Sequence, residues 1–399
     1  MDANKDKVIF RRTLHPVGHG AFFTEHLKTV DGKRREKAFL NVVYDCGTTA
    51  RGDNVPSLIR KEIGITFDKD EHIDLLFISH FDEDHTNGLK CLLDNTKMDS
   101  DTYVVIPFRF PYLFIALNDR YPSLAGFINR ARQRGVRFVG IHNEGLNPIP
   151  ESVKWDKNIS KVLRQDKNNL FTAWDLVKEQ PLWYFYPFMN VNADSLQQVF
   201  ERAIKDDEKL KDVDLDDPNV VIAHKDELKK IYQGIGKSKD NVTRINVNSL
   251  LMLSLPARGV FKDYVSRIGL YMGYDYDHMG IPEVYVNCGL TCLYTGDLVI
   301  DNESLDKIDR SATGVMKSLS DYEMIHLFQI PHHGSWRSFS PSLFDALHGK
   351  VRATFVNGNP YRKWYRGYRE LIGEAARASI PLYIVSQSFH SRIEMVGDM

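Results

Sequence analysis

The sequence predicts an α/β protein in which helices cover layers of strands. Short apolar runs of strand length occupy both ends of the chain, and helical patterns intervene between them. Polar motifs directly follow several of these runs. Layered α/β proteins place their chemistry where strands end, so we expect a functional site there.

Strands dominate the first part of the chain. Residues 8–12, 21–27 and 38–44 have strand-like patterns, and the polar turn VDGKRRE predicts a hairpin between the last two. The run IDLLFIS at 73–79 is apolar throughout, which is typical of a strand covered on both faces. A similar short strand is expected at 104–107.

The pattern changes over residues 108–241. Helices are expected at 124–135 and 194–210, joined by aromatic pieces such as LWYFYPFM, and an acidic run covers 206–217. We interpret this block as an inserted, mainly helical lid or subdomain. Residues 1–107 and 242–399 would then form one domain around it.

Strands resume after the insertion. SLLMLSL at 249–255 is one, and a hairpin turning on CGL is expected from 283–287 and 291–294. The remaining expected elements are strands at 323–329, 351–356 and 382–385 and a helix at 365–378.

Composition limits the class of protein. The 399 residues include 43% hydrophobic and 11% aromatic side chains, which excludes global disorder. With 52 basic and 53 acidic residues, the formal net charge is −1, which argues against a uniformly basic DNA-coating protein. A local basic groove is still compatible with that total, because patches of charge attract phosphates.

The chain is expected to be soluble and cytoplasmic, without a membrane partner. No apolar run approaches the roughly 20 residues of a membrane helix, and the N-terminus lacks the apolar segment of a signal peptide. The four cysteines have no zinc-ribbon spacing and are interpreted as buried thiols of a reducing compartment: Cys46, Cys91, Cys288 and Cys292.

The hexapeptide HFDEDH follows the IDLLFIS run. In an extended segment, His80, Asp82 and Asp84 would point to one side, with His85 turned toward a second position. Imidazole and carboxylate groups are ligands for zinc, manganese or iron. The alternative is a solvated acidic loop.

Two further motifs follow expected strands. In TGD, Gly296 allows close backbone approach and Asp297 can bridge two cations, although Gly-Asp is also a common turn. In PHHGS, one of His332 and His333 can ligate metal while the other meets substrate. A structural pair of histidines is the alternative. Together with Asp45, these motifs all lie at predicted strand ends.

The combined pattern resembles the metallo-β-lactamase superfamily, and within it the hydrolase domain of ComEC-type competence proteins. The resemblance rests on VGHGAFF, YDCG, SHFDEDHTNGL, NVNSLLML, YTGD, PHHGS and NGNPY, and excludes residues 108–241. It implies a four-layer αββα sandwich with two divalent metal ions, zinc or manganese. The implied ligands are His80 and Asp82 for one ion, Asp84 and His85 for the other, Asp297 between them, and His332 or His333 at the second ion. Asp45 would orient the ligands, or the loop that carries them, without binding a metal ion itself.

The chain departs from the superfamily pattern at two positions. Asp82 stands where most members have a second histidine, a change shared with the ComEC type. The usual third histidine is not evident, since Asn246 or Asn248 occupies the comparable stretch. His278 can replace it from a loop, or can simply be solvated. Oxygen enrichment of the first site favours zinc or manganese over zinc alone.

The stretch YRKWYRGYR at 361–369 interleaves basic and aromatic residues. We expect Tyr361, Arg362 and Lys363, with Ser335, to contact a phosphodiester substrate through charge and stacking. ComEC-type proteins carry a histidine where Arg362 or Lys363 stands, and an amphipathic helix start is the alternative. Four arginines form a second basic cluster, either a solvated helix face or part of a groove: Arg130, Arg132, Arg134 and Arg137.

These observations predict a metal-dependent hydrolase. Two metal ions activate water, Asp84 or Asp82 receives a proton, and His332 is the expected proton donor or substrate contact. The favoured activity is that of a phosphodiesterase or nuclease acting on nucleic acid. The alternatives are hydrolysis of a small phosphodiester or other ester, and a non-catalytic binding module with a degraded metal site.

Overall fold

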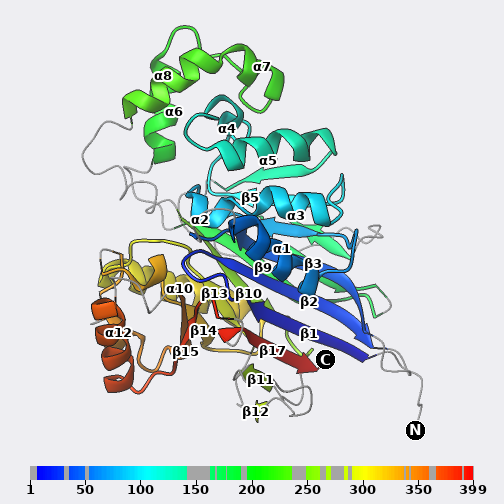
Figure 1. Cartoon of the computed structure of the whole chain (residues 1–399), viewed down its shortest axis with the longest axis vertical. Coiled ribbons are helices and arrows are strands. Elements are labelled where there is room, and N and C mark those ends of the chain that lie inside the picture. Colours follow the sequence, from blue (N-terminus) through cyan, green and yellow to red (C-terminus); the bar gives the residue numbers. More distant parts are fainter. Residues whose placement is uncertain are drawn as a thin grey trace.

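The computed structural model has a mixed α/β fold with two sheets, which confirms the α/β part of the prediction (Figure 1). The described residues are 7–30, 36–49, 54–141, 162–166, 169–176, 178–189, 196–235, 249–260, 267–270, 283–285, 290–336, 338–340, 343–358, 365–388 and 391–398.

The first sheet has nine strands in the order β12-β11-β17-β1-β2-β3-β4-β5-β6. From β12 to β3 the neighbours are antiparallel, and from β3 to β6 they are parallel. Its strands are β1 (Lys7–Leu14), β2 (Phe22–Val30), β3 (Glu36–Cys46), β4 (Leu75–Phe77), β5 (Tyr103–Ile106), β6 (Arg137–Gly140), β11 (Arg267–Leu270), β12 (Glu283–Tyr285) and β17 (Ile393–Asp398). The predicted hairpin between β2 and β3 is confirmed.

The second sheet has eight strands in the order β16-β15-β14-β13-β10-β9-β8-β7. Strands β13 to β16 are parallel, and the rest pair antiparallel. Its strands are β7 (Leu163–Gln165), β8 (Phe171–Asp175), β9 (Gln180–Met189), β10 (Leu250–Pro256), β13 (Cys292–Tyr294), β14 (Ile325–Gln329), β15 (Val351–Asn357) and β16 (Leu382–Val385). Every residue of β10 is buried, as expected of a strand covered on both faces.

One apolar core joins the two sheets. Phe10 of β1 stacks on Trp183 of β9 with ring centroids 3.8 Å apart, and Phe23 meets Tyr294 and Phe355 from the second sheet. A buried charged network crosses this core. Arg12 donates to Glu25 at 2.7 Å and lies 3.0 Å from the Tyr294 hydroxyl.

Helices cover the outer faces of both sheets. The core beneath the first sheet includes residues of α1 (Asn54–Thr66), α3 (Leu89–Asn95), α4 (Leu113–Ala116), α5 (Pro122–Gln133), α6 (Leu196–Asp206), α7 (Pro218–Ala223) and α8 (Lys225–Ile235). The outer face of the second sheet packs on α10 (Asn302–Leu319), α11 (Leu343–Leu347) and α12 (Tyr365–Arg377). Figure 1 shows α6, α7 and α8 beyond α4 at one end of the molecule, far from α12.

The block expected to be a mainly helical insertion contributes to both sheets. Its residues form β6 of the first sheet and β7, β8 and β9 of the second. The aromatic run that we interpreted as a connection is most of β9, and its side chains are buried from Leu182 to Met189. Large aromatic residues are common in strands, and here they fill both faces of β9. The block does contain helices, as predicted. A domain boundary at residue 107 is wrong, because strands from within the block belong to both sheets.

The predicted hairpin on CGL is wrong. Strand β12 pairs with β11 in the first sheet, whereas β13 pairs with β10 and β14 in the second. Two apolar segments on either side of a glycine resemble a hairpin locally. Here each segment instead pairs with strands of a different sheet. Cys46, Cys91 and Cys292 are free thiols; Cys46 and Cys292 are buried as expected, whereas Cys91 is only partly buried, and Cys288 lies outside the described residues. Among the described residues, no helix is both long and apolar enough to cross a membrane.

Candidate metal centre

The predicted motifs converge where strands of the two sheets end. Asp45 lies near the end of β3 and His80 follows β4 in the first sheet. Asp297 follows β13 of the second sheet, and β14 leads into a short 3-10 turn, η1 (His332–Gly334). The sheets are connected here, because Leu250 donates its backbone N–H to the carbonyl of Ser79 at 2.7 Å.

Asp297 is the centre of this cluster, and its side chain is buried. Its Oδ1 lies 3.3 Å from Nε2 of His85 and 3.8 Å from Nε2 of His333. Its Oδ2 lies 3.5 Å from Nε2 of His80 and 3.7 Å from Nε2 of His332. Each carboxylate oxygen therefore faces one imidazole from HFDEDH and one from PHHGS.

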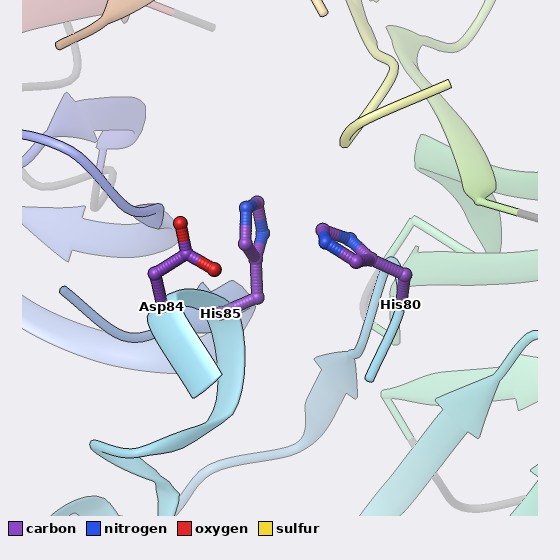
Figure 2. A group of neighbouring side chains, drawn as sticks. All are labelled: His80, Asp84 and His85. Atoms are coloured by element: carbon purple, nitrogen blue, oxygen red, sulfur yellow. The ribbon is translucent and has the colours of Figure 1, made fainter. Parts of the chain in front are cut away.

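Asp84 lies on the Oδ1 side of this carboxylate. Its Oδ2 is 3.2 Å from Nε2 of His333. Figure 2 shows Asp84 and His85 on one helical turn, with the ring of His80 facing that of His85 from the preceding loop. Two groups have ligand atoms all within 4.8 Å of one another: His80, Asp84 and His85, and His85, Asp297 and His333.

The expected extended geometry of HFDEDH is wrong. The helix α2 (Glu83–Thr86) begins inside it, so Asp84 and His85 are consecutive residues of a helical turn. Acidic residues are favoured in the first turn of a helix because they interact with its positive end. Asp82 precedes α2 with its side chain 43% exposed, and its Oδ2 is 3.8 Å from Nε2 of His80.

The Nδ1 atoms of these histidines are held by other groups. His85 Nδ1 donates to Asp45 at 2.7 Å, and His333 Nδ1 donates to the carbonyl of Asn357 at 3.0 Å. His80 Nδ1 lies 2.9 Å from Ser79 Oγ, which itself donates to Asp45. The expected orienting role of Asp45 thus has a direct geometric basis. With Nδ1 protonated, Nε2 of each ring offers its lone pair to the space around Asp297.

The electrostatics of the cluster favour a cation. Burial by itself would raise the pKa of Asp297, but the imidazoles of His333, His85 and His80 lower it well below its usual range. Burial likewise opposes charging of His85, yet Asp297 and Asp45 raise its pKa well above the ordinary value. Without a metal ion, protons on the histidines provide the positive charge beside these carboxylates. A bound metal ion would displace those protons and provide the positive charge itself.

The donor set fits divalent metal ions. Within the described part of the chain, the buried atoms His80 Nε2, His85 Nε2 and Asp297 Oδ1 have no hydrogen-bond partner. Tetrahedral ligands about 2.1 Å from a zinc ion lie about 3.4 Å apart. The separations of 3.3–3.8 Å around Asp297 are close to that value. Nitrogen and carboxylate oxygen ligands suit zinc or manganese.

Two glycines of the motifs permit this convergence. A Cβ on Gly47 would lie 2.4 Å from the backbone carbonyl carbon of Asp84, so a side chain there would displace α2. Gly296 has φ +55°, and a Cβ there would lie 2.6 Å from the Cβ of Ser79. The glycine expected to allow close approach before Asp297 does so.

Sequence reasoning did not identify three neighbours of the centre. The ring of His19, from VGHGAFF, lies over that of His333 with centroids 4.2 Å apart. Gln329 accepts through Oε1 from the backbone N–H groups of Thr295 and Gly296, which holds the TGD turn. The buried Asn357 positions His333. The motifs VGHGAFF and NGNPY contained two of these residues, but the role of each depends on packing.

The expected substrate residues are only partly described. Tyr361, Arg362 and Lys363 lie outside the described residues, as do Asn246, Asn248 and His278. Ser335 is half-buried beside η1 and donates its backbone N–H to the carbonyl of His332. Tyr368, in the same basic-aromatic stretch, belongs to the core, and its hydroxyl donates to the carbonyl of His333 at 3.0 Å.

The second basic cluster makes local contacts. Arg130 pairs with Asp94 at 2.9 Å, Arg134 donates to the carbonyl of Leu93, and Arg137 donates to the Tyr103 hydroxyl. These contacts favour a solvated surface over a substrate groove, but the four arginines do not form one helix face, because Arg134 follows the end of α5 and Arg137 lies in β6.

Comparison with known proteins adds no assignment. No model of a known protein family matches the chain, and no curated protein matches it either.

Proposed function

We propose that this chain is a metal-dependent hydrolase with the four-layer αββα fold of the metallo-β-lactamase superfamily, cleaving phosphodiester bonds in nucleic acid. The observation that carries the proposal is the arrangement around Asp297, whose two oxygens face four imidazoles beside Asp84. Two zinc or manganese ions held by these residues would supply an activated water and would stabilise charge on the reacting phosphate.

The protein's own groups divide the remaining work. Asp297 stays ionised, because the neighbouring imidazoles lower its pKa, and it supplies negative charge to both halves of the centre. Asp45 and Ser79 orient His85 and His80. Asp82 has the most exposed carboxylate of the cluster and is suited to transfer a proton to solvent, and Asp84 is the second candidate.

An exposed aromatic residue supports a nucleic-acid substrate. Trp336 is 48% exposed and follows Ser335 directly, two residues after η1. An indole at this position can stack on an unpaired base, as aromatic residues do in proteins that bind single strands. Tyr361, Arg362 and Lys363 stay predicted contacts to the same substrate. Single-stranded or flexible nucleic acid is therefore the proposed target.

The direct test combines metal content with a panel of substrates. The purified chain would be loaded with zinc or manganese and assayed on labelled single-stranded DNA, single-stranded RNA and a small chromogenic phosphodiester. We expect cleavage of at least one polymer, and its loss in Asp84→Ala with the fold retained. Asp94→Ala is the matched control, because it removes a carboxylate that pairs with Arg130 away from the centre.

Three outcomes would change the proposal. Absence of bound metal and of hydrolysis would favour a binding module. Cleavage of the small diester alone would move the substrate class to small esters. Full activity in Asp84→Ala would show that this cluster is not the site of hydrolysis. Trp336→Ala should lower cleavage of polymers by about 5- to 150-fold while sparing the small substrate, because stacking contributes about 1–3 kcal/mol per base.

A further inference from the structure

The backbone at PHHGS has an unusual conformation. His332, His333 and Gly334 have φ values of 49°, 53° and 73°, all in the left-handed region. Side chains of adjacent residues usually diverge, in strands to opposite faces and in helices around the axis. Residues other than glycine rarely adopt this conformation, and strain of this kind clusters at functional sites. Here it turns two consecutive imidazoles toward one carboxylate.

The two imidazoles approach different oxygens of Asp297. His333 lies on the Oδ1 side, where its Nε2 is also 3.2 Å from Asp84. His332 lies on the Oδ2 side with His80, and the two Nε2 atoms are 3.7 and 3.5 Å from that oxygen. The ring of His332 is oriented as a ligand would be, because its Nδ1 lies within hydrogen-bonding distance of Ser338 Oγ.

We infer that His332 is a ligand of the first metal ion, beside His80 and Oδ2 of Asp297. This inference rests on the proposed function because it requires a metal centre at Asp297. It replaces the expected role of His332 as a proton donor or substrate contact. Of the two adjacent histidines of PHHGS, His332 then binds the first ion and His333 binds the second.

The assignment makes the two positions unequal. The second is surrounded by Asp84, His85 and His333 together with Oδ1 of Asp297. The first has His80, His332 and Oδ2, with the half-exposed Asp82 as a fourth group. A carboxylate that is partly exposed retains part of its hydration and holds an ion less firmly. The first ion should therefore bind more weakly and be removed first by a chelator.

The test measures bound metal rather than activity alone. His332→Asn and His333→Asn are suitable variants, because asparagine tolerates the left-handed backbone that both positions require. Each protein would be stripped, titrated with manganese or cobalt, and analysed for metal bound per chain after dialysis. Circular dichroism would establish that each variant is folded. Ser338→Ala serves as a milder variant, since it removes only the group that orients the His332 ring.

We expect two ions in the wild-type chain and one in the His332→Asn variant, with the retained ion binding within a few-fold of the tighter wild-type ion. Ser338→Ala should retain both positions but bind the first ion about 10–100-fold more weakly. The His333→Asn variant should lose the tighter ion.

Two ions at unchanged affinity in the His332→Asn variant would overturn the inference while leaving the proposed function intact. Loss of both ions in that folded variant would also overturn it, because His332 would then not serve one position. A wild-type chain that binds no metal would overturn the inference and the proposed function together.

Discussion

The carboxylate of Asp45 lies 2.7 Å from Nδ1 of His85, on the opposite edge of the ring from Asp297. Both groups are buried. A proton shared between Asp45 and Nδ1 leaves Nε2 as the lone-pair donor, and a carboxylate partner makes the imidazole a stronger ligand. The ligand atom of His85 is therefore set by a residue 40 positions away in the sequence.

Asp45→Asn is expected to weaken metal binding about 10–100-fold. The substituted amide keeps the size of the side chain and tolerates the φ of 56° at this position, but it removes the negative charge that holds the Nδ1 proton. Competition with a chelating dye measures the affinity. Ser79→Ala leaves the Asp45–His85 contact in place and should have a smaller effect. Equal affinities of Asp45→Asn and the wild type would contradict this role.

Gly296→Ala should damage both folding and metal binding. The added Cβ would approach the Cβ of Ser79 to 2.6 Å, and φ is +55°. Relief of that clash requires the loops that carry His80 and Asp297 to separate. A matched substitution is Gly314→Ala in α10, where the new Cβ meets nothing within 4 Å. It should stabilise the protein by about 0.5–1 kcal/mol. Denaturant midpoints and metal content of both variants provide the measurement, and tolerance of Gly296→Ala would count against the close approach.

Much of this centre was predictable because its residues are local to strand ends. The motifs around Asp45, Asp297 and His333 follow apolar runs, and parallel strands bring such ends together. The distribution of His332 and His333 over two oxygens could not be predicted. It depends on a left-handed backbone at two consecutive histidines, which is uncommon for any residue except glycine.

The errors in the fold have a common physical cause. Strand β9 was interpreted as part of an insertion because its aromatic residues lack a period-two pattern when both faces are buried. Strands β12 and β13 resemble a hairpin locally but pair in different sheets. Pairing between strands distant in sequence is set by packing of the whole domain, which a local pattern does not report.

The buried Arg12–Glu25 pair predicts a large loss of stability when one partner is neutralised. Arg12 is fully buried, and burial by itself would lower its pKa, whereas Glu25 and Tyr294 hold the pKa above its usual range. Glu25→Gln leaves a buried guanidinium without its counter-charge and should reduce the free energy of unfolding by about 3–5 kcal/mol. The urea midpoint measures this change.

The control for this pair is the same substitution at the surface. Glu303→Gln breaks an exposed ion pair with Lys307 one helical turn away, at 2.7 Å. Exposed helical pairs contribute about 0.3–0.5 kcal/mol, so the change should be small. Similar losses in Glu25→Gln and Glu303→Gln would show that the buried pair contributes little to stability.

Acid pH should destabilise the fold through buried neutral histidines. Burial lowers the pKa of His26 to about 3, and its Nδ1 donates to Asn41 Oδ1. In the unfolded chain the pKa returns to about 6.5, so the unfolded state binds the extra proton first as pH falls. The contribution of His26 is complete above pH 6.5 or so and is lost progressively as pH falls toward 3. His15 and His326, each lowered by burial to about 4, act in the same direction.

The pH effect can be measured on the metal-free chain, so that release of metal does not contribute to the slope. Between pH 7.5 and 5.0, each such histidine should lower the free energy of unfolding by about 2 kcal/mol. His26→Gln removes the titrating group, so its stability should decline by about 2 kcal/mol less than that of the wild type over this interval. His348→Gln, at an exposed position, serves as the control substitution. If His26→Gln and the wild type lose equal stability, His26 is not held neutral by burial.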